Sequence, residues 1–273
     1  MKKQLHCGGL LIEHTFSVLP GIGEKLEQRI WQQSILSWND FLAQPFVEGI
    51  APARKHLYDL RLQEFQGALH AGDAPYFSRN VKRREHWRLF ERFRGDVVCL
   101  DIETNGFHPA QGGYVTVIGL YDGFESITLV RGENLTVSAL NQCLFGYKLL
   151  ITFYGAGFDV PFMLAALPGV SFEMPHFDLC FAARRLGIDG GLKRIEQQFG
   201  LSRDTAVEGM NGYDAVLLWQ RMQAGDPEAR SLLLTYNRED TVNLLPLAEL
   251  LYERLRASTG LSEYYSGAAY GCP

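Results

Sequence analysis

The sequence predicts an α/β protein in which a mixed sheet flanked by helices follows a helical N-terminal region. Residues 1–94 show mainly helical periods and breakers, and strands alternate with helices from residue 95 onward. The continuous apolar run 148–153 is typical of a strand buried on both faces of a parallel sheet. We therefore predict three parts: a helical region (1–94), an α/β domain (95–257) and a loosely ordered tail (258–273) rich in Gly, Ser, Ala and Tyr.

The N-terminal region is expected to contain a short strand near Leu10–Ile12, followed by helices. Apolar positions at helical spacing and turn residues set their limits. Ser37, with Asp40 three residues later, is typical of a helix N-cap. The predicted helices cover Glu24–Gln33, a short segment after Ser37, Ala53–His70 and Lys82–Phe93.

The α/β domain is expected to begin with three consecutive strands, joined at Asp122-Gly123 by a hairpin turn. A helix and a parallel strand follow, and then helices alone, which gives the order β-β-β-α-β-α. The predicted strands are Val97–Glu103, Tyr114–Tyr121, Ser126–Val130 and Lys148–Phe153. The predicted helices are Leu135–Phe145, Val160–Leu167, Asp178–Leu186, Leu192–Phe199, Tyr213–Ala224 and Pro227–Arg256.

Composition places the chain among ordinary globular proteins. No apolar run approaches the roughly 20 residues of a membrane span, and the basic N-terminus lacks the apolar segment of a secretory signal. The five cysteines are scattered without a C-x-x-C spacing, which argues against a zinc site or a disulfide framework. We therefore expect no membrane partner and a cytoplasmic location.

The most informative motif is an Asp-x-Glu pair at the end of the first strand. Because strand side chains alternate between two faces, Asp101 and Glu103 point the same way. Two adjacent carboxylates repel each other, and a hard cation such as Mg²⁺ or Mn²⁺ would compensate that charge. Taken alone, the pair is more simply a strand end that meets solvent.

Two further acids are candidate partners of the pair. Asp159 follows the buried strand through a glycine-rich turn, at the sheet edge where α/β proteins bind ligands; alone, it is better explained as a helix N-cap. Asp240 lies four residues after Tyr236 on the apolar stripe of the last helix. A carboxylate on a packing face needs a partner, and a metal explains it better than a neighbouring arginine does.

With these motifs in order, the chain resembles the DEDD exonucleases of the ribonuclease H-like fold, in the tyrosine subclass. More narrowly, it is similar to the YprB-like ribonuclease H-like proteins. The resemblance covers about Trp87 to Leu251 and also includes the Gly190–Glu196 stretch. One departure is Gly155, where related proteins usually carry Asn, and it bears on substrate preference and rate more than on metal binding.

The resemblance implies a metal-dependent nuclease, with a 3′→5′ exonuclease as the expected activity. Two divalent cations, Mg²⁺ or Mn²⁺, would lie about 4 Å apart. The resemblance assigns them to Asp101, Glu103, Asp159 and Asp240, and Tyr236 would orient the attacking water. The expected partner is a single-stranded 3′ end of DNA or RNA. Residues expected to contact it are Thr104, Asn105 and Phe107, whereas Phe158 is expected to pack in the core.

Two N-terminal features are candidate nucleic-acid contacts. Gly21 and Gly23 lie in a segment that resembles a helix-hairpin-helix element, although Glu27 replaces the expected small residue; a plain glycine turn is an equal alternative. Arg84 and Arg88, with Arg92, would form one stripe on a helix, suited either to phosphates or to solvent.

Two other functions compete with the nuclease hypothesis. The first is a non-catalytic nucleic-acid-binding protein that retains the fold, which the presence of four acids and the tyrosine disfavours. The second is a metal-dependent enzyme that acts on another phosphoester, which the basic segment between Ser78 and Arg94 disfavours.

Overall fold

A five-stranded mixed sheet forms the centre of the protein. The computed structural model describes residues 10–268. The sheet order is β3-β2-β1-β4-β5, in which β1, β2 and β3 pair antiparallel and β4 and β5 extend β1 in parallel. The strands are β1 (Val97–Thr104), β2 (Val115–Tyr121), β3 (Ser126–Val130), β4 (Leu149–Thr152) and β5 (His176–Asp178). The predicted mixed sheet is confirmed, and the three-residue β5 is an addition to it.

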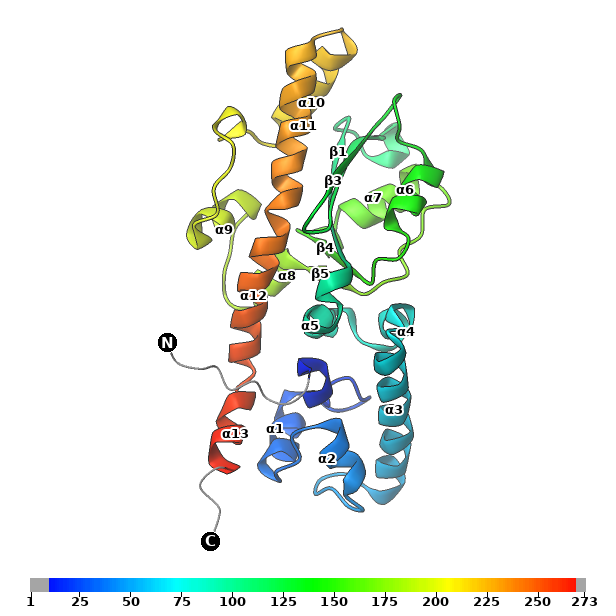
Figure 1. Ribbon diagram of the computed structural model, residues 1–273, viewed down its shortest axis with the longest axis vertical. Helices are drawn as coiled ribbons and strands as arrows, with labels where there is room; N and C mark the ends of the chain where they lie inside the picture. Colours follow the sequence, from blue (N-terminus) through cyan, green and yellow to red (C-terminus); the bar gives the residue numbers. More distant parts are fainter. Residues whose placement is uncertain (1–9, 269–273) are drawn as a thin grey trace.

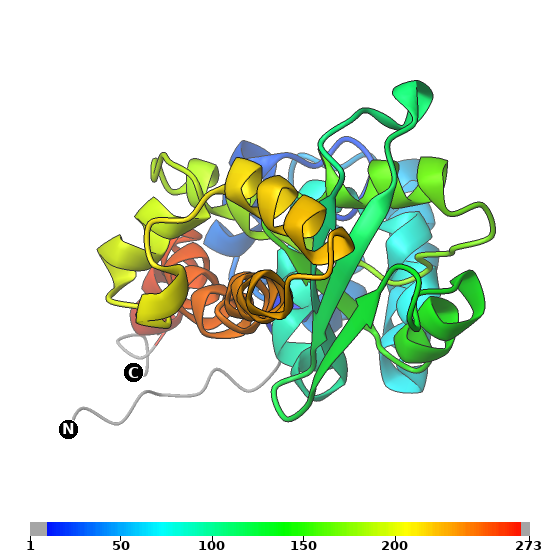
Figure 2. The same ribbon diagram turned by 90° about the horizontal axis from the view of Figure 1, so that it is seen from above.

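Helices cover both faces of the sheet (Figures 1 and 2). On one face lie α10 (Gly212–Gln223) and α11 (Pro227–Val242). On the other lie α6 (Val137–Leu144) and α7 (Asp159–Ala166). The alternation along β1 serves both faces: Leu100 and Ile102 belong to the α6/α7 core, so the intervening acids face α11.

The N-terminal region packs beneath the sheet and shares one hydrophobic core with it (Figure 1). Residues of this region pack with β1, β4, α8 and α12. The remaining helices are η1 (Leu11–His14), α1 (Glu24–Gln32), α2 (Trp38–Ala43), α3 (Pro52–Ala71), α4 (Ala74–Asn80), η2 (Arg83–Leu89), α5 (Phe90–Phe93), η3 (Arg94–Asp96), η4 (Pro109–Gln111), α8 (Leu179–Arg185), α9 (Leu192–Phe199), η5 (Thr205–Val207), α12 (Leu244–Ser258) and α13 (Leu261–Ala268). No described helix combines the length and apolar character needed to cross a membrane.

Two N-terminal predictions change in the structure. The strand expected near Leu10–Ile12 is wrong, because the 3-10 helix η1 begins there and the Glu13 carboxylate accepts a bond from the Leu10 N–H. The helix expected over Lys82–Phe93 is wrong over most of its length. Residues 83–89 form a 3-10 helix in which five consecutive side chains, from Glu85 to Leu89, are buried. Burial of five consecutive side chains differs from the one-sided burial of a surface α-helix.

Two C-terminal predictions also change. The helix expected from Pro227 to Arg256 is divided at Asn243 into α11 and α12, because Pro246 lacks the N–H that would bond to the Val242 carbonyl. The loose tail expected after residue 258 is wrong as far as residue 268. Residues 261–268 form α13, and the Tyr264 ring lies 5.5 Å from that of Trp31. The last five residues lie outside the described part.

Candidate metal centre

The paired acids of β1 face α11 at a place where the helix approaches the sheet closely. Asp101 pairs across the ladder with Gly119 of β2. A Cβ atom at Gly119 would lie 2.5 Å from Asn237 Oδ1, so only glycine admits the α11 side chain there. Asn237 Nδ2 donates to Asp101 Oδ2 over 2.9 Å and fixes the orientation of that carboxylate.

The α11 helix brings a third carboxylate to the pair. Asp240 lies one turn beyond Tyr236, and both side chains are buried. Carboxylate oxygens of Asp101, Glu103 and Asp240 lie within 4.8 Å of one another. Arg203 forms an ion pair with Asp240 and a second one with Glu196 at 2.6 Å, so one cation already balances part of this charge.

Asp159 lines the same pocket but stands slightly apart from the three. It is the first residue of α7 and not its cap, which contradicts the N-cap alternative. Its Oδ1 accepts a bond of 3.2 Å from the Ile102 N–H of β1, which ties the helix start to the strand that carries the pair. The structure therefore brings all four predicted acids to one pocket and clusters three of them tightly.

Burial makes the ionised form of these acids unfavourable. It raises the pKa of Asp101 and of Glu103 well above their usual range, and the nearby Asp240 carboxylate adds to the rise. Burial also raises the pKa of Asp159 from 3.8 to about 7. Closely packed carboxylates with raised pKa values are expected where a cation is to be bound.

Tyr236 lies beside the carboxylates and is held by a lysine of α9. Lys193 Nζ donates to the Tyr236 hydroxyl over 2.9 Å, and it also donates to the Met210 carbonyl. Burial raises the pKa of Tyr236 well above its ordinary value, with the Asp240 charge as the next cause. The phenol is therefore protonated at neutral pH and can orient a water molecule.

The pocket above the acids has a volume of about 860 Å³ and a rim of aromatic side chains. Exposed aromatics that line it are Phe107, Tyr154, Phe158 and Tyr213. The core position expected for Phe158 is wrong, since its side chain is 43% exposed. Thr104 also lines the pocket. Asn105 does not line it. Its side-chain amide donates to the Gly112 carbonyl and accepts from the Tyr114 N–H, and these two hydrogen bonds hold the loop after β1.

The turn that precedes Asp159 explains the glycine at position 155. A Cβ atom there would lie 2.3 Å from Thr152 Oγ1, which already accepts a bond from the Gly155 N–H. The Thr152 hydroxyl is also hydrogen-bonded, at 2.7 Å, to His176 Nε2. The space that an asparagine side chain would need is thus filled by this buried polar pair.

The predicted N-terminal contacts lie elsewhere. Gly21 and Gly23 do not line the acidic pocket; Gly23 is the N-cap of α1, and the buried Glu27 carboxylate accepts bonds from residues 15–17. The exposed arginine stripe is a wrong prediction, because Arg88 is 3% exposed and donates to Glu85 over 2.9 Å. Arg84 remains exposed, near a second pocket.

Comparison with known proteins agrees with this geometry. Residues 98–252, more than half of the chain, match the sequence model of the family RNase_H_2, described as the RNase_H superfamily. The chain belongs to the RNase H superfamily. No curated protein shows a significant sequence match to it. Within the matched residues, β1 carries Asp101 and Glu103, and the helices α7 and α11 carry Asp159 and Asp240.

Three solved structures illustrate the structural similarities of this RNase H-like chain. One is titled "apo form of the nuclease" (21% identity, TM-score 0.44, 66% of this chain and 87% of that one). Another is NrnC of Brucella melitensis (20%, 0.40, 67% and 89%). The third is the family B DNA polymerase of the archaeon Pyrobaculum calidifontis (19%, 0.49, 59% and 25%).

The residues of this RNase H-like site fit a divalent cation. The donors are carboxylate oxygens, which hard cations prefer, and the described residues of the cluster include no histidine or cysteine. Sequence reasoning missed Lys193, Arg203 and Asn237. Signals were available for two of them: Asn237 follows Tyr236 on a predicted helix, and Lys193 lies in the Gly190–Glu196 stretch of the resemblance. Arg203 lies in the loop after α9, whose path the sequence does not reveal.

Proposed function

We propose that the protein is a divalent-metal-dependent nuclease that hydrolyses phosphodiester bonds of nucleic acid, stepwise from a 3′ end. The observation that carries this proposal is the carboxylate cluster of half-buried Asp101 with buried Glu103 and Asp240, beside a protonated tyrosine. Membership of the RNase H superfamily agrees with this chemistry. The fourth acid, Asp159, extends the donor set along the same pocket wall.

The residues divide into holding and orienting roles. The four acids would hold Mg²⁺ or Mn²⁺, and two ions are proposed. Bound cations would supply a more acidic water and stabilise charge on the phosphate. Tyr236 orients the attacking water through its hydroxyl, and Lys193 keeps that hydroxyl in place. Asn237 keeps the Asp101 carboxylate turned toward the pocket.

The aromatic rim supports a single-stranded substrate. Phe107 and Phe158 stand exposed at the pocket, where bases of an unpaired strand can stack on them. A duplex keeps its bases stacked on each other and leaves these rings without partners. Thr104, next to the acids, is placed to contact the terminal nucleotide.

Digestion of labelled oligonucleotides tests the proposal. We expect 5′-labelled single-stranded DNA or RNA to shorten progressively in Mg²⁺ or Mn²⁺, with mononucleotides released, and EDTA to stop the reaction. Asp101→Asn should abolish cleavage, because it removes a negatively charged metal ligand. The amide oxygen of the new side chain can still accept the hydrogen bond from Asn237. Glu228→Gln, an exposed acid on the same α11 helix, is the matched control and should retain activity. Binding without cleavage under all metal conditions would instead indicate a non-catalytic binding protein.

A further inference from the structure

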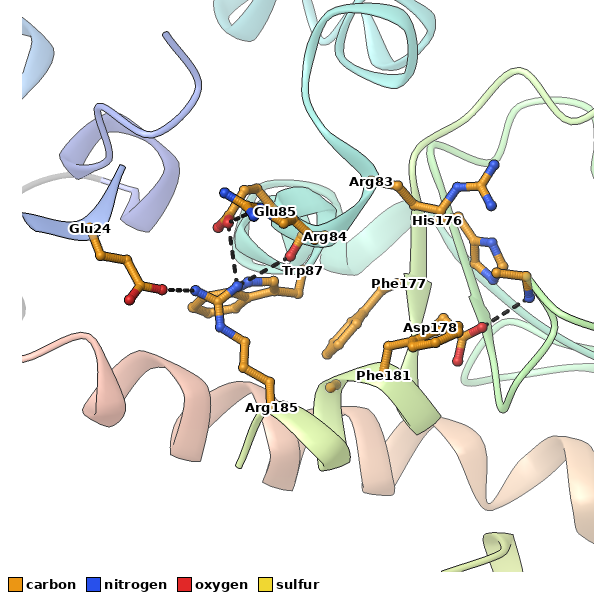
Figure 3. Close-up of a pocket in the computed structure, with 12 residues that line it drawn as sticks. Glu24, Arg83, Arg84, Glu85, Trp87, His176, Phe177, Asp178, Phe181 and Arg185 are labelled. Carbon is orange, nitrogen blue, oxygen red and sulfur yellow. Dashed lines mark hydrogen bonds and ion pairs between the residues drawn. The ribbon is translucent and has the colours of Figure 1, made fainter. Parts of the chain in front are cut away.

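A second pocket lies beside the metal centre, where the N-terminal region meets β5 and α8. Its volume is about 560 Å³ (Figure 3). Its lining includes Arg83, Arg84, Trp87, Phe177, Phe181 and Arg185. None of the residues expected to bind metal lines it, so it is distinct from the acidic pocket.

Its wall combines aromatic rings with arginines. Trp87, Phe177 and Phe181 form the apolar part, and Arg83 and Arg185 stand on opposite sides of it in Figure 3. Within residues 10–268, Arg83 makes no ion pair, and the buried Trp87 Nε1–H finds no acceptor. A flat aromatic ligand that carries an anionic group suits such a wall.

The carboxylates of this pocket are already engaged. Glu85 is shared by Arg84 and Arg185, each at 3.3 Å, and by the buried Arg88. Asp178 accepts from backbone N–H groups of the turn before α7. Both Nη atoms of Arg185 are also engaged, by Glu85 and by Glu24, each at 3.3 Å. Among the described residues, Arg83 and the Nη groups of Arg84 therefore remain for an anion from outside, as phosphate contacts require.

A strained turn forms the boundary between the two pockets. Tyr154 and Gly157 line the acidic pocket, whereas Ala156 lines the second one. Tyr154 has φ +63°, a left-handed conformation that is costly for a bulky residue. Asp178 holds it there, because its two oxygens accept from the Tyr154 and Ala156 N–H groups, each over 2.9 Å. The strain presents the Tyr154 ring, 44% exposed, between the pockets.

A row of two exposed aromatic rings and an arginine runs from one pocket to the other. The Tyr154 and Phe181 ring centroids lie 6.1 Å apart, and Phe181 is 47% exposed. Arg184 extends over both rings, 5.9 Å and 5.6 Å from their centroids. Alternating aromatic platforms and arginines are what a single nucleic-acid strand binds along its length.

We propose that the second pocket is an upstream subsite for the single-stranded substrate. With the 3′-terminal nucleotide at the carboxylates, the strand passes over Tyr154 and Phe181, and a base further upstream enters the pocket against Trp87. Its phosphates lie by Arg83 and Arg84. This rests on the proposed nuclease function and adds that the preferred substrate is a strand of several nucleotides.

Length-dependent binding tests the subsite. In an Asp101→Asn background, which prevents cleavage, fluorescence anisotropy measures the Kd of 5′-labelled dinucleotides and hexanucleotides of dT and of rU. We expect the hexanucleotide to bind at least about 10-fold more tightly than the dinucleotide. Phe181→Ala combined with Arg184→Ala should remove most of that ratio. Both side chains are exposed, so thermal unfolding should show an intact fold. Phe145→Ala, at an exposed phenylalanine after α6, is the control and should keep the ratio.

Each outcome has a defined meaning. A ratio that falls in the double variant but not in the Phe145→Ala control supports the subsite. Equal Kd values for the two lengths, including no measurable binding of either, would overturn it, as would a double variant with an unchanged ratio. Failure of the nuclease proposal is seen separately, as absence of cleavage by the unmodified protein whatever the binding ratio.

Discussion

Replacement of Asp159 by Asn should stabilise the metal-free protein while it impairs metal binding. Asp159 is 4% exposed, and burial raises its pKa from 3.8 to about 7. At about 1.4 kcal/mol for each pKa unit, ionised Asp159 costs the folded state about 4 kcal/mol above pH 7. An Asn oxygen still accepts the bond from the Ile102 N–H, so the variant removes the charge and keeps the contact.

Urea unfolding at pH 7.5 in EDTA measures this effect. We expect the free energy of unfolding of Asp159→Asn to exceed that of the unmodified protein by up to about 4 kcal/mol. Because the folded-state pKa is raised, the cost is present at high pH and disappears as the pH falls toward 3.8. At pH 4.5 the difference should therefore shrink to about 1 kcal/mol. Glu228→Gln, an exposed acid in the first turn of α11, should change stability by less than about 1 kcal/mol at either pH.

Added Mg²⁺ should reduce the stability advantage of Asp159→Asn over the unmodified protein. A cation that binds only the folded state stabilises it by about 2.7 kcal/mol at 100 times its Kd, and the variant should gain less than the unmodified protein does. A variant that is no more stable than the unmodified protein in EDTA at pH 7.5 would refute the reasoning. So would a stability difference that is the same at pH 4.5 and pH 7.5.

Three further predictions concern residues around the site. Lys193→Gln should lower kcat about 10- to 100-fold in nuclease assays with little change in substrate affinity, because Tyr236, the residue proposed to orient the water, loses its 2.9 Å bond. Gly155→Asn should lower the free energy of unfolding by about 1–3 kcal/mol in thermal melts, because its Cβ would overlap Thr152; an unchanged melt would show that the turn has room. Burial lowers the pKa of His86 to about 4. As the pH falls, His86 therefore takes up a proton in the unfolded chain at a higher pH than in the folded protein. The unmodified protein should thus lose about 2 kcal/mol more than His86→Gln between pH 7.5 and pH 5, whereas exposed His56→Gln should match the unmodified protein.

The sequence predicted best those elements whose burial pattern is regular. Ser126–Val130 and Leu192–Phe199 have the predicted limits, and the Ser37 cap forms a capping box with Asp40. Strand alternation was enough to place Asp101 and Glu103 on one face, because that inference depends on local geometry alone. The meeting of these acids with Asp240 depended on the resemblance, since no local pattern tells which strand α11 crosses.

Consecutive burial is what misled the prediction of the 83–93 segment. Apolar residues at helical spacing predicted one helix with a stripe of arginines on it, but the side chains from Glu85 to Leu89 are all enclosed where the N-terminal region meets the sheet. Arg88 is buried with two acids, Glu85 at 2.9 Å and Glu27 at 4.0 Å. A surface helix has a solvent face, whereas a segment between two packed layers has none, and composition does not distinguish them.

The N-terminal region contributes to the site through a buried chain of hydrogen bonds. His86 of η2 bonds to the Val81 carbonyl and accepts from the His176 N–H of β5, each over 3.0 Å. The His176 ring then bonds to Thr152, which holds the Gly155 N–H of the turn before Asp159. Buried polar groups are costly unless every member is paired, so this chain fixes η2 and the turn relative to each other. The contact between η2 and β5 also forms one wall of the second pocket. Removal of residues 1–94 would therefore disturb both the turn that places Asp159, a proposed metal ligand, and the proposed upstream subsite.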